Sequence, residues 1–248
     1  MNIKEFFTEH NRTALAFSGG VDSSYLLYAG IESGADVCAY YVRTEFQPQF
    51  EYDDAMRMAE MLGARIKVIE LSVLDCPEIS ANDAKRCYYC KKRIFSAICN
   101  AAACDGYSEI LDGTNASDDI SDRPGFASLQ ELSVLSPLRD CGLTKDEIRK
   151  LSRDAGLFTW NKPAYACLAT RTAVYEKLTA EKLKKTEEAE EVLSGLGFVD
   201  FRVRNSDGNA RLEIRKEQFG LLFDNVGQIM EKLKPLYKTI SLDLEGRK

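Results

Sequence analysis

One short stretch constrains the fold of this chain more than any other. An apolar, β-favouring run at 13–17 breaks at Ser18-Gly19-Gly20, and a helical pattern follows from residue 23 to about residue 31. A strand, a tight glycine turn and a helix are therefore expected in this order. A strand that leads directly into a helix is the opening of an α/β unit rather than of a hairpin.

Further strands and helices alternate along the first half of the chain. Apolar runs at 37–42 and 66–71 flank a helical pattern at 52–62, and shorter strand candidates lie at 109–111 and 132–135. Strands that alternate with helices favour a parallel sheet with helices on both faces. The fold class predicted for this part is α/β, a doubly wound parallel sheet.

The pattern of expected helices and strands changes at about 172–178. The elements expected after this point are a charged amphipathic helix at 179–196, strands at 201–204 and 211–214, a second helix that ends at residue 233, and a last strand at 239–242. This order predicts a small C-terminal α+β domain. We therefore expect two domains, 1–172 and 178–248, the second serving substrate binding, oligomerisation or both.

Composition narrows the class of function. A formal net charge of −6 disfavours a broad nucleic-acid footprint and favours a small-molecule substrate. Neither a signal peptide nor an apolar run of membrane-spanning length is evident, so a cytoplasmic enzyme without a membrane partner is expected. The eight cysteines would then be kept reduced. His10 is the single histidine, which leaves no material for zinc sites built on paired histidines.

The turn at 18–24 has the features of a phosphate-binding loop. Its glycines let backbone amides approach an anion, Ser18 and Ser23 add hydroxyl groups, and the helix N-terminus adds its positive end. No lysine follows the glycines, so this is not a Walker A loop. The pattern SGGxDS matches the PP-loop of enzymes that cleave ATP to AMP and pyrophosphate, although an ordinary glycine-rich turn is the alternative. Asp22 would repel phosphates unless Mg²⁺ intervened, which predicts a magnesium ligand.

A second polar strand end follows the strand candidate at 109–111. It carries Gly113, Thr114, Asn115 and Asp118, which we predict to bind the nucleotide because open α/β sheets bind ligands at the carboxyl ends of their strands. A common surface turn is the alternative interpretation.

Three cysteines stand out by their surroundings. Cys87 and Cys90 form a C-x-x-C flanked by basic residues, and Cys167 lies in the stretch Lys162-Pro-Ala-Tyr-Ala-Cys-Leu-Ala-Thr-Arg171. A C-x-x-C suits a metal, an iron–sulfur cluster or a redox dithiol, and the residues alone leave these open, with Cys167 as a third ligand or simply a buried thiol. The other cysteines show no ligand spacing and are expected to be fillers or surface thiols.

Taken together, the motifs resemble the LarE-type sulfur transferases, which complete the nickel-pincer nucleotide of lactate racemase. The segments that carry the resemblance run along nearly the whole chain: SGGVDSS, CYYCKK, DGTNASD, SPL, KPAYACLATR, FRVR, ARLEI and LDLEG. One departure is the stretch 205–209, where the family more often has a His-Gly-Asp type of turn.

The resemblance implies a reaction. ATP would adenylylate the carboxylates of pyridinium-3,5-biscarboxylic acid mononucleotide, pyrophosphate would leave, and sulfur would displace AMP to give thiocarboxylates. The catalytic residues implied are Asp22 and Cys167. Cys87, Cys90 and Cys167 together would hold a [4Fe-4S] cluster that carries sulfur from sulfide or another donor.

The resemblance also implies a homo-oligomer, with a hexamer suggested by the family. Members without the C-x-x-C sacrifice the sulfur of the cysteine that corresponds to Cys167. The side chains expected to contact the substrate are Arg171, Arg204, Arg211 and Glu213.

Two other functions compete with this reading. Several tRNA thiolases combine a PP-loop with three cluster-binding cysteines, and such an enzyme would need a basic RNA-binding face. A non-catalytic nucleotide-binding metal or redox sensor would bind ATP without releasing pyrophosphate.

Overall fold

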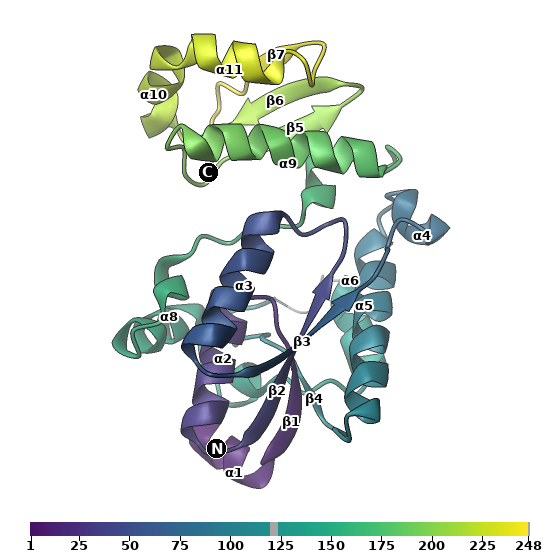
Figure 1. Ribbon diagram of the computed structural model, residues 1–248, viewed down its shortest axis with the longest axis vertical. Helices are drawn as coiled ribbons and strands as arrows, with labels where there is room; N and C mark the ends of the chain where they lie inside the picture. The colour runs from purple at the N-terminus through teal and green to yellow at the C-terminus, as the bar shows by residue number, and fades with distance from the viewer. Residues whose placement is uncertain (120–123, 248) are drawn as a thin grey trace. The chain divides into compact units, whose positions relative to one another are not determined.

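The computed structural model describes residues 1–119 and 124–247, except for the side chain of Pro124. The chain divides into two compact units (Figure 1). The first comprises Met1–Val73 and Cys87–Ala164, and the second comprises Leu74–Arg86 and Tyr165–Lys248. Two hydrophobic clusters lie in the first unit and one in the second.

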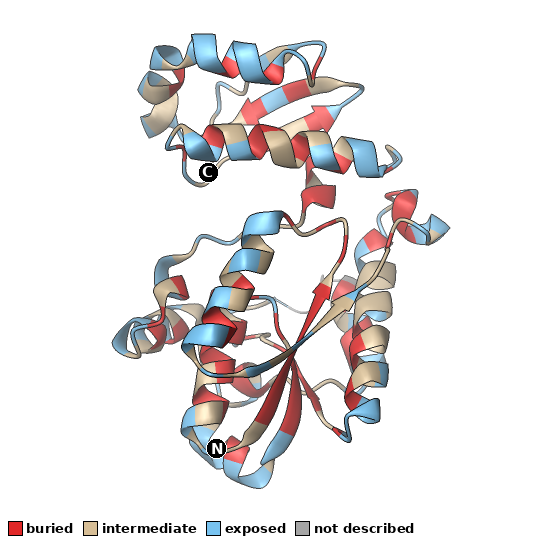
Figure 2. Cartoon of the chain, viewed as in Figure 1, coloured by how far each residue is buried: buried red, intermediate tan, exposed pale blue. Residues whose placement is uncertain are grey.

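The first unit is built on a parallel sheet with the strand order β3-β2-β1-β4. Its strands are β1 (Arg12–Ala16), β2 (Asp36–Arg43), β3 (Arg65–Glu70) and β4 (Ile110–Leu111). The two central strands, β1 and β2, are apolar along most of their length because both of their faces are covered (Figure 2).

Helices cover both faces of this sheet, because alternate strand residues point to opposite sides. Leu15 and Tyr41 pack with α1 (Ile3–Glu9), α2 (Val21–Glu32), α3 (Gln49–Met61) and α8 (Lys145–Asp154). Tyr40, on the other face, packs with α5 (Arg86–Cys104) and α6 (Pro124–Glu131). The doubly wound α/β class predicted from the sequence is therefore confirmed.

Two sequence predictions for the first unit were inaccurate. The strand expected at 132–135 is reduced to one bridge, between Leu135 and Leu111, because Ser133 adopts a positive φ of 54° and turns the chain just before it. No element was predicted between the third strand and residue 109, where the structure has α4 (Pro77–Ser80), which belongs to the second unit, and the long helix α5. The short helices of the first unit include α7 (Pro137–Asp140) and η1 (Phe158–Asn161).

The second unit packs helices against a sheet with the order β5-β6-β7. Its elements after residue 165 are η2 (Leu168–Arg171), α9 (Ala180–Gly195), β5 (Arg202–Ser206), β6 (Asn209–Glu213), η3 (Lys216–Gln218), α10 (Phe219–Asp224), α11 (Val226–Leu233) and β7 (Ile240–Leu242). Strand β6 is antiparallel to β5 and parallel to β7. Their core joins Leu193, Val203, Leu212 and Ile229. The order matches the α+β expectation, with the second helix divided in two at Asn225.

The boundary between the units differs from the one expected at 172–178. Asn82 is fully buried, and its side-chain amide donates to the backbone carbonyls of Ala173 (2.7 Å) and Glu176 (3.0 Å). The backbone carbonyl of Asn82 accepts from the backbone N–H of Tyr175 (2.8 Å). These bonds join the loop after β3 to the stretch expected to be a linker, so both belong to the second unit. Among the described helices, none is long and apolar enough to cross a bilayer.

Candidate active site

The phosphate loop, residues 18–24, leads from β1 into α2. Gly19 has a φ of +69°, and a Cβ there would lie 2.8 Å from the backbone Cα of Ala55 on α3. Only glycine fits this position without moving the helix. Gly20 is the N-cap of α2 and has no side chain to occupy the free amides of the first turn. The loop thus presents backbone amides at a helix N-terminus, as an anion requires.

The two serine hydroxyls of the loop lie together. Ser18 Oγ is 3.1 Å from Ser23 Oγ, and Ser23 Oγ accepts from the backbone N–H of Ser18 at 3.3 Å. Ser18 Oγ also accepts from the N–H of Gly20 at 3.3 Å. The long distances show weak bonds that an incoming phosphate oxygen can replace.

The carboxylate of Asp22 has two partners. Asn115 Nδ2 donates to its Oδ1 at 3.4 Å, and Lys145 Nζ lies 2.7 Å from its Oδ2. The side chains of Lys145 and Asp22 are 32% and 23% exposed, so the pair stands at the surface of the site and not in the core. The sequence interpretation did not include Lys145, which is 123 residues away from Asp22.

The structure brings the second nucleotide motif to the phosphate loop. A Cβ on Gly113 would lie 3.2 Å from the backbone nitrogen of Ser23 and 3.3 Å from Asp22 Cβ, so glycine lets the end of β4 approach the start of α2. Asn115 is buried and donates to Asp22. Of the predicted nucleotide residues, Gly113 and Asn115 therefore lie at the loop.

The remaining two residues of that motif hold its shape. Thr114 donates through its backbone N–H and its hydroxyl to Asp112, which is buried and also accepts from Ser136 Oγ at 2.7 Å. Asp118 Oδ2 accepts from the backbone N–H of Asn115 at 3.0 Å. These bonds fix the backbone of the motif in the position from which Asn115 reaches Asp22.

Cys87 and Cys90 lie in the first turn of α5, in the first unit. They are three residues apart and share one side of the helix, with Cys87 exposed and Cys90 partly buried. Helix α5 itself was missed, although the apolar spacing of Phe95, Ile98 and Ala102 signals a helix. Thiolates one helical turn apart are suitable ligands for an iron–sulfur cluster.

Cys167 precedes η2, in the second unit, and its backbone is held firmly. Its carbonyl accepts from Thr170 Oγ1 at 2.8 Å and from Arg171 Nη1 at 3.3 Å. Arg171 Nη1 also donates to the carbonyl of Ala166. The turn that carries this cysteine is thus organised by one arginine side chain.

Arg171, a predicted substrate contact, is buried although it belongs to the lining of a cavity in the second unit. Only 1% of it is exposed, and its Nε and Nη2 donate to Glu190 at 2.8 and 3.1 Å. Glu190 also accepts from Tyr165 Oη at 2.5 Å and from the N–H of Val203 at 3.0 Å. This buried network joins η2, α9 and β5, and its bonds occupy the guanidinium that was expected to bind substrate.

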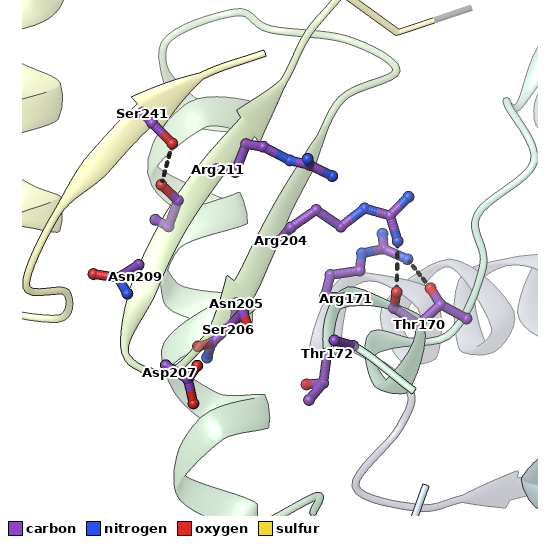
Figure 3. A pocket seen from close by; sticks show the side chains of 12 residues that line it. Thr170, Arg171, Thr172, Arg204, Asn205, Ser206, Asp207, Asn209, Arg211 and Ser241 are labelled. Carbon is purple, nitrogen blue, oxygen red and sulfur yellow. Dashed lines mark hydrogen bonds between the residues drawn. The ribbon is translucent and has the colours of Figure 1, made fainter. Parts of the chain in front are cut away.

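A cavity of about 480 Å³ opens between η2 and the strands of the second unit (Figure 3). Arg204 and Arg211 line it from directly opposite positions on β5 and β6. Like charges placed in this way destabilise a sheet unless something neutralises them. Glu213 does so in part, because it accepts from Arg204 at 2.9 Å and from Arg211 at 3.0 Å. We call this cavity the arginine pocket.

Arg202, which the sequence interpretation missed, is the second arginine of β5 and lies beside the pocket rather than in its lining. Its register partner across the strands is Glu213, and among the described residues its side chain makes no hydrogen bond or ion pair. Burial, followed by the charges of Arg247, Arg171 and Arg204, lowers the pKa of its guanidinium. Guanidinium groups that lie close together can bind an anion, which would offset their mutual repulsion. The alternation in the FRVR motif, which puts Arg202 and Arg204 on one face of a strand, was the available signal.

The predicted metal and cluster ligands have side chains of the right chemical type. Asp22 and Asn115 offer the oxygen ligands that Mg²⁺ prefers, and Cys87, Cys90 and Cys167 offer the thiolates that iron–sulfur clusters require. Within residues 1–119 and 124–247, the structure has no group of three or more His, Cys, Asp or Glu side chains that could hold a metal ion.

Curated relatives match nearly the whole chain. An uncharacterized protein of Synechocystis sp. is 32% identical over 250 residues, which cover 99% of this chain and 93% of the relative. The pyridinium-3,5-bisthiocarboxylic acid mononucleotide synthase of Lactiplantibacillus plantarum is 33% identical over 240 residues, 95% of this chain and 86% of the synthase. This chain belongs to the LarE-type family. The resemblance read from the motifs is confirmed, and with it the expectation of an enzyme.

A second group of relatives matches a shorter segment. A tRNA-specific 2-thiouridylase of Clostridium botulinum is 30% identical over 181 residues, which cover 60% of this chain and 51% of the thiouridylase. This similarity supports the PP-loop fold of the chain. No model of a known protein family matches this chain.

Proposed function

We propose that this chain is an ATP-dependent sulfurtransferase that converts the carboxylates of pyridinium-3,5-biscarboxylic acid mononucleotide into thiocarboxylates. The observation that carries the proposal is the 33% identity, over 95% of the chain, to a synthase named for the bisthiocarboxylic acid product. The glycine-lined phosphate loop beside Asp22 supports the use of ATP. We place the enzyme in the cytoplasm, where thiols stay reduced, and expect a homo-oligomer.

The first half-reaction activates the substrate. A carboxylate oxygen attacks the α-phosphorus of ATP, the bond from that phosphorus to the bridging oxygen of the β-phosphate breaks, and pyrophosphate leaves. The product is a mixed anhydride whose leaving group is AMP, whereas an untreated carboxylate would have to expel oxide. In the second half-reaction sulfur attacks the acyl carbon, and AMP leaves with the original carboxylate oxygen.

The phosphate loop would receive the pyrophosphate portion of ATP. Its backbone amides, with Ser18 and Ser23, would bind phosphate oxygens, and Asn115 would hold the Asp22 carboxylate in place. Asp22 would bind Mg²⁺, which when present neutralises the charge of the β- and γ-phosphates. The bonds of Thr114 and Asp118 keep Gly113 and Asn115 against the start of α2.

The arginine pocket would bind the phosphate and carboxylate groups of the substrate. Arg204 and Arg211 share the carboxylate of Glu213, and Arg211 Nε also lies 3.7 Å from Asp243 Oδ2. With Arg202 on the same face of β5, three cations are set against two carboxylates, so the group retains positive charge. A phosphate is the strongest ligand for guanidinium groups arranged in this way. Arg171, which is committed to Glu190, would shape the pocket and not contact the substrate.

Sulfur delivery would depend on Cys87, Cys90 and Cys167. A [4Fe-4S] cluster on three thiolates supplies, when bound, one iron without a protein ligand, which can carry sulfide.

The test combines purification without air, iron and sulfide analysis, and an assay of AMP formation with the biscarboxylate nucleotide. Cys87→Ala, Cys90→Ala and Cys167→Ala should each lose iron and sulfur transfer, while Cys141→Ala serves as the matched control. An active Cys87→Ala protein whose Cys167 has become dehydroalanine after turnover would show a sacrificial mechanism, with the sulfurtransferase proposal intact. Absence of substrate-dependent AMP formation by the wild-type protein would contradict the proposal itself.

Transfer of sulfur to tRNA is the second candidate, favoured by the similarity to a 2-thiouridylase. That similarity leaves about half of the thiouridylase unmatched, and the net charge of this chain is −6. Titration with tRNA at two salt concentrations decides, because binding through phosphate contacts weakens steeply with salt. We expect no salt-dependent binding.

A further inference from the structure

Arg86 is buried at a position that disfavours a cation. It is the first residue of α5, where the positive end of the helix dipole repels its charge, and only 9% of it is exposed. Although the rest of α5 belongs to the first unit, Arg86 itself belongs to the second. Taking a guanidinium out of water is costly unless its N–H groups find acceptors, so the acceptors of Arg86 indicate its role.

One nitrogen of Arg86, Nη1, donates to two carbonyl oxygens. The first is the side-chain oxygen of Asn82, four residues earlier in the chain. The second is the backbone oxygen of Ala169, at a distance of 3.3 Å and 83 residues later. Ala169 lies in η2 and is fully buried, and its oxygen also accepts from the backbone N–H of Thr172 at 3.4 Å. Of these two donors to Ala169, the charged guanidinium forms the stronger bond.

Asn82 holds the guanidinium of Arg86 in place. Its φ of +59° is a backbone conformation that asparagine adopts more readily than most residues. Its side-chain nitrogen donates to the backbone carbonyls of Ala173 and Glu176, so its side-chain oxygen is left to accept from Arg86. The segment that ends at Arg86 is thereby bonded both to η2 and to the residues that follow η2.

Cys167 lies two residues before Ala169, in the same turn. Arg171, at the end of η2, donates to the carbonyl of Cys167 and to that of the residue before it. Two arginines therefore hold this turn, Arg171 from its C-terminal end and Arg86 from the segment 74–86. Because both bind backbone carbonyls, they restrict the conformation from which the Cys167 thiol can react.

We propose that Arg86 is a positioning residue for sulfur transfer, which keeps the Cys167 turn closed through the carbonyl of Ala169. The proposal rests on the function proposed above, in which Cys167 takes part in the delivery of sulfur, and it holds whether that thiol is a cluster ligand or the source of the sulfur. Without the guanidinium, the carbonyl of Ala169 would keep the weaker bond from Thr172, and the turn would open more often. Activation by ATP, which uses the phosphate loop of the first unit, would continue.

The test follows the Cys167 turn directly, in the full chain treated with a chelator and a reductant so that its thiols are free. Two rates are measured by mass spectrometry: alkylation of Cys167 by iodoacetamide, and hydrogen exchange of peptides from 165–172. The wild type is compared with Arg86→Met, Arg86→Lys and Lys85→Met. Lys85 precedes Arg86 and is exposed, so its substitution removes an equal charge and leaves the turn untouched. Cys141, in the first unit, is the reference thiol.

We expect Arg86→Met to raise both rates at the turn about 10- to 100-fold, as the loss of a charged donor to a buried carbonyl does. Arg86→Lys keeps the charge without the planar fork, so its rates should rise about threefold. Lys85→Met should match the wild type. In turnover assays with the biscarboxylate nucleotide, Arg86→Met should form AMP within about twofold of the wild-type rate and thiocarboxylate about tenfold or more slowly, because a displaced reactive group costs rate in the step that uses it.

Unchanged alkylation and exchange at the turn of Arg86→Met would overturn the proposal. Equal acceleration of exchange in 165–172 and in 202–206, another part of the same unit, would also overturn it, because a general loss of stability would then be the cause. So would a parallel fall of AMP and thiocarboxylate formation. If the wild-type protein formed no thiocarboxylate, the proposed function would fall, whereas a normal wild type with an unaffected Arg86→Met refutes only the role of Arg86.

Discussion

Removal of the Glu190 carboxylate should destabilise the second unit severely. The side chain is 7% exposed and accepts four hydrogen bonds, two from Arg171, one from Tyr165 and one from the backbone of Val203. Glu190→Ala leaves a guanidinium charge buried without its partner, which costs about 3–5 kcal/mol. The unsatisfied N–H of Val203 adds about 1–3 kcal/mol. Because contributions within one network are not additive, we expect a total of about 4–6 kcal/mol.

Urea unfolding followed by circular dichroism measures this loss, and hydrogen exchange of peptides from 165–171 and 202–206 assigns it to the second unit. Glu191→Ala is the matched control, since Glu191 is the next residue of α9 and is exposed. Its effect should stay within about 0.5 kcal/mol. A loss below about 1 kcal/mol for Glu190→Ala would refute the reasoning, because the buried pair would then have to be solvated or replaceable.

Two further variants test the phosphate loop. Asp22→Asn should leave the fold intact and abolish pyrophosphate release, because it removes the metal ligand and keeps the loop geometry; full turnover of ATP by this variant, measured with a pyrophosphate assay, would contradict the magnesium role. Gly19→Ala should lose ATP binding and about 1–3 kcal/mol of stability, since it forces alanine into a positive φ and against the backbone of Ala55; Gly34→Ala, at a φ of +75° with open space around it, separates the backbone cost from the steric one.

The first unit shows what sequence patterns reveal well. Strands β1, β2 and β3 lie within one residue of the expected ranges at each end, because buried parallel strands are continuous apolar runs bounded by polar turns. The phosphate loop was predictable because glycine, serine and a following helix are local requirements of anion binding. The strand expected at 132–135 failed for a local reason as well, since one residue in a positive φ ended the extended run.

Partnerships across the sequence were beyond such patterns. Lys145 and Asp22 meet only because α8 packs on α2, and no local spacing reports that contact. Arg171 was named as a substrate contact from the resemblance to the family and from its positive charge. In the structure its guanidinium pairs with Glu190. Glu190 is one of several glutamates on α9, and the sequence gives no sign that this one is buried. The role of Arg171 and of Glu190 depends on their burial, which cannot be predicted from the sequence for a single charged residue.

The buried pair also separates stability from catalysis in one double variant. Arg171→Met with Glu190→Leu removes both charges together, so no unpaired ion remains and most of the stability lost in Glu190→Ala should return. The carbonyls of Ala166 and Cys167, however, still lack the donor that holds their turn. We therefore expect AMP formation, which depends on the phosphate loop of the other unit, to persist, while transfer of sulfur falls at least tenfold in the same samples. If sulfur transfer recovered in proportion to stability, Arg171 would be a structural residue only, and the turn at Cys167 would position itself.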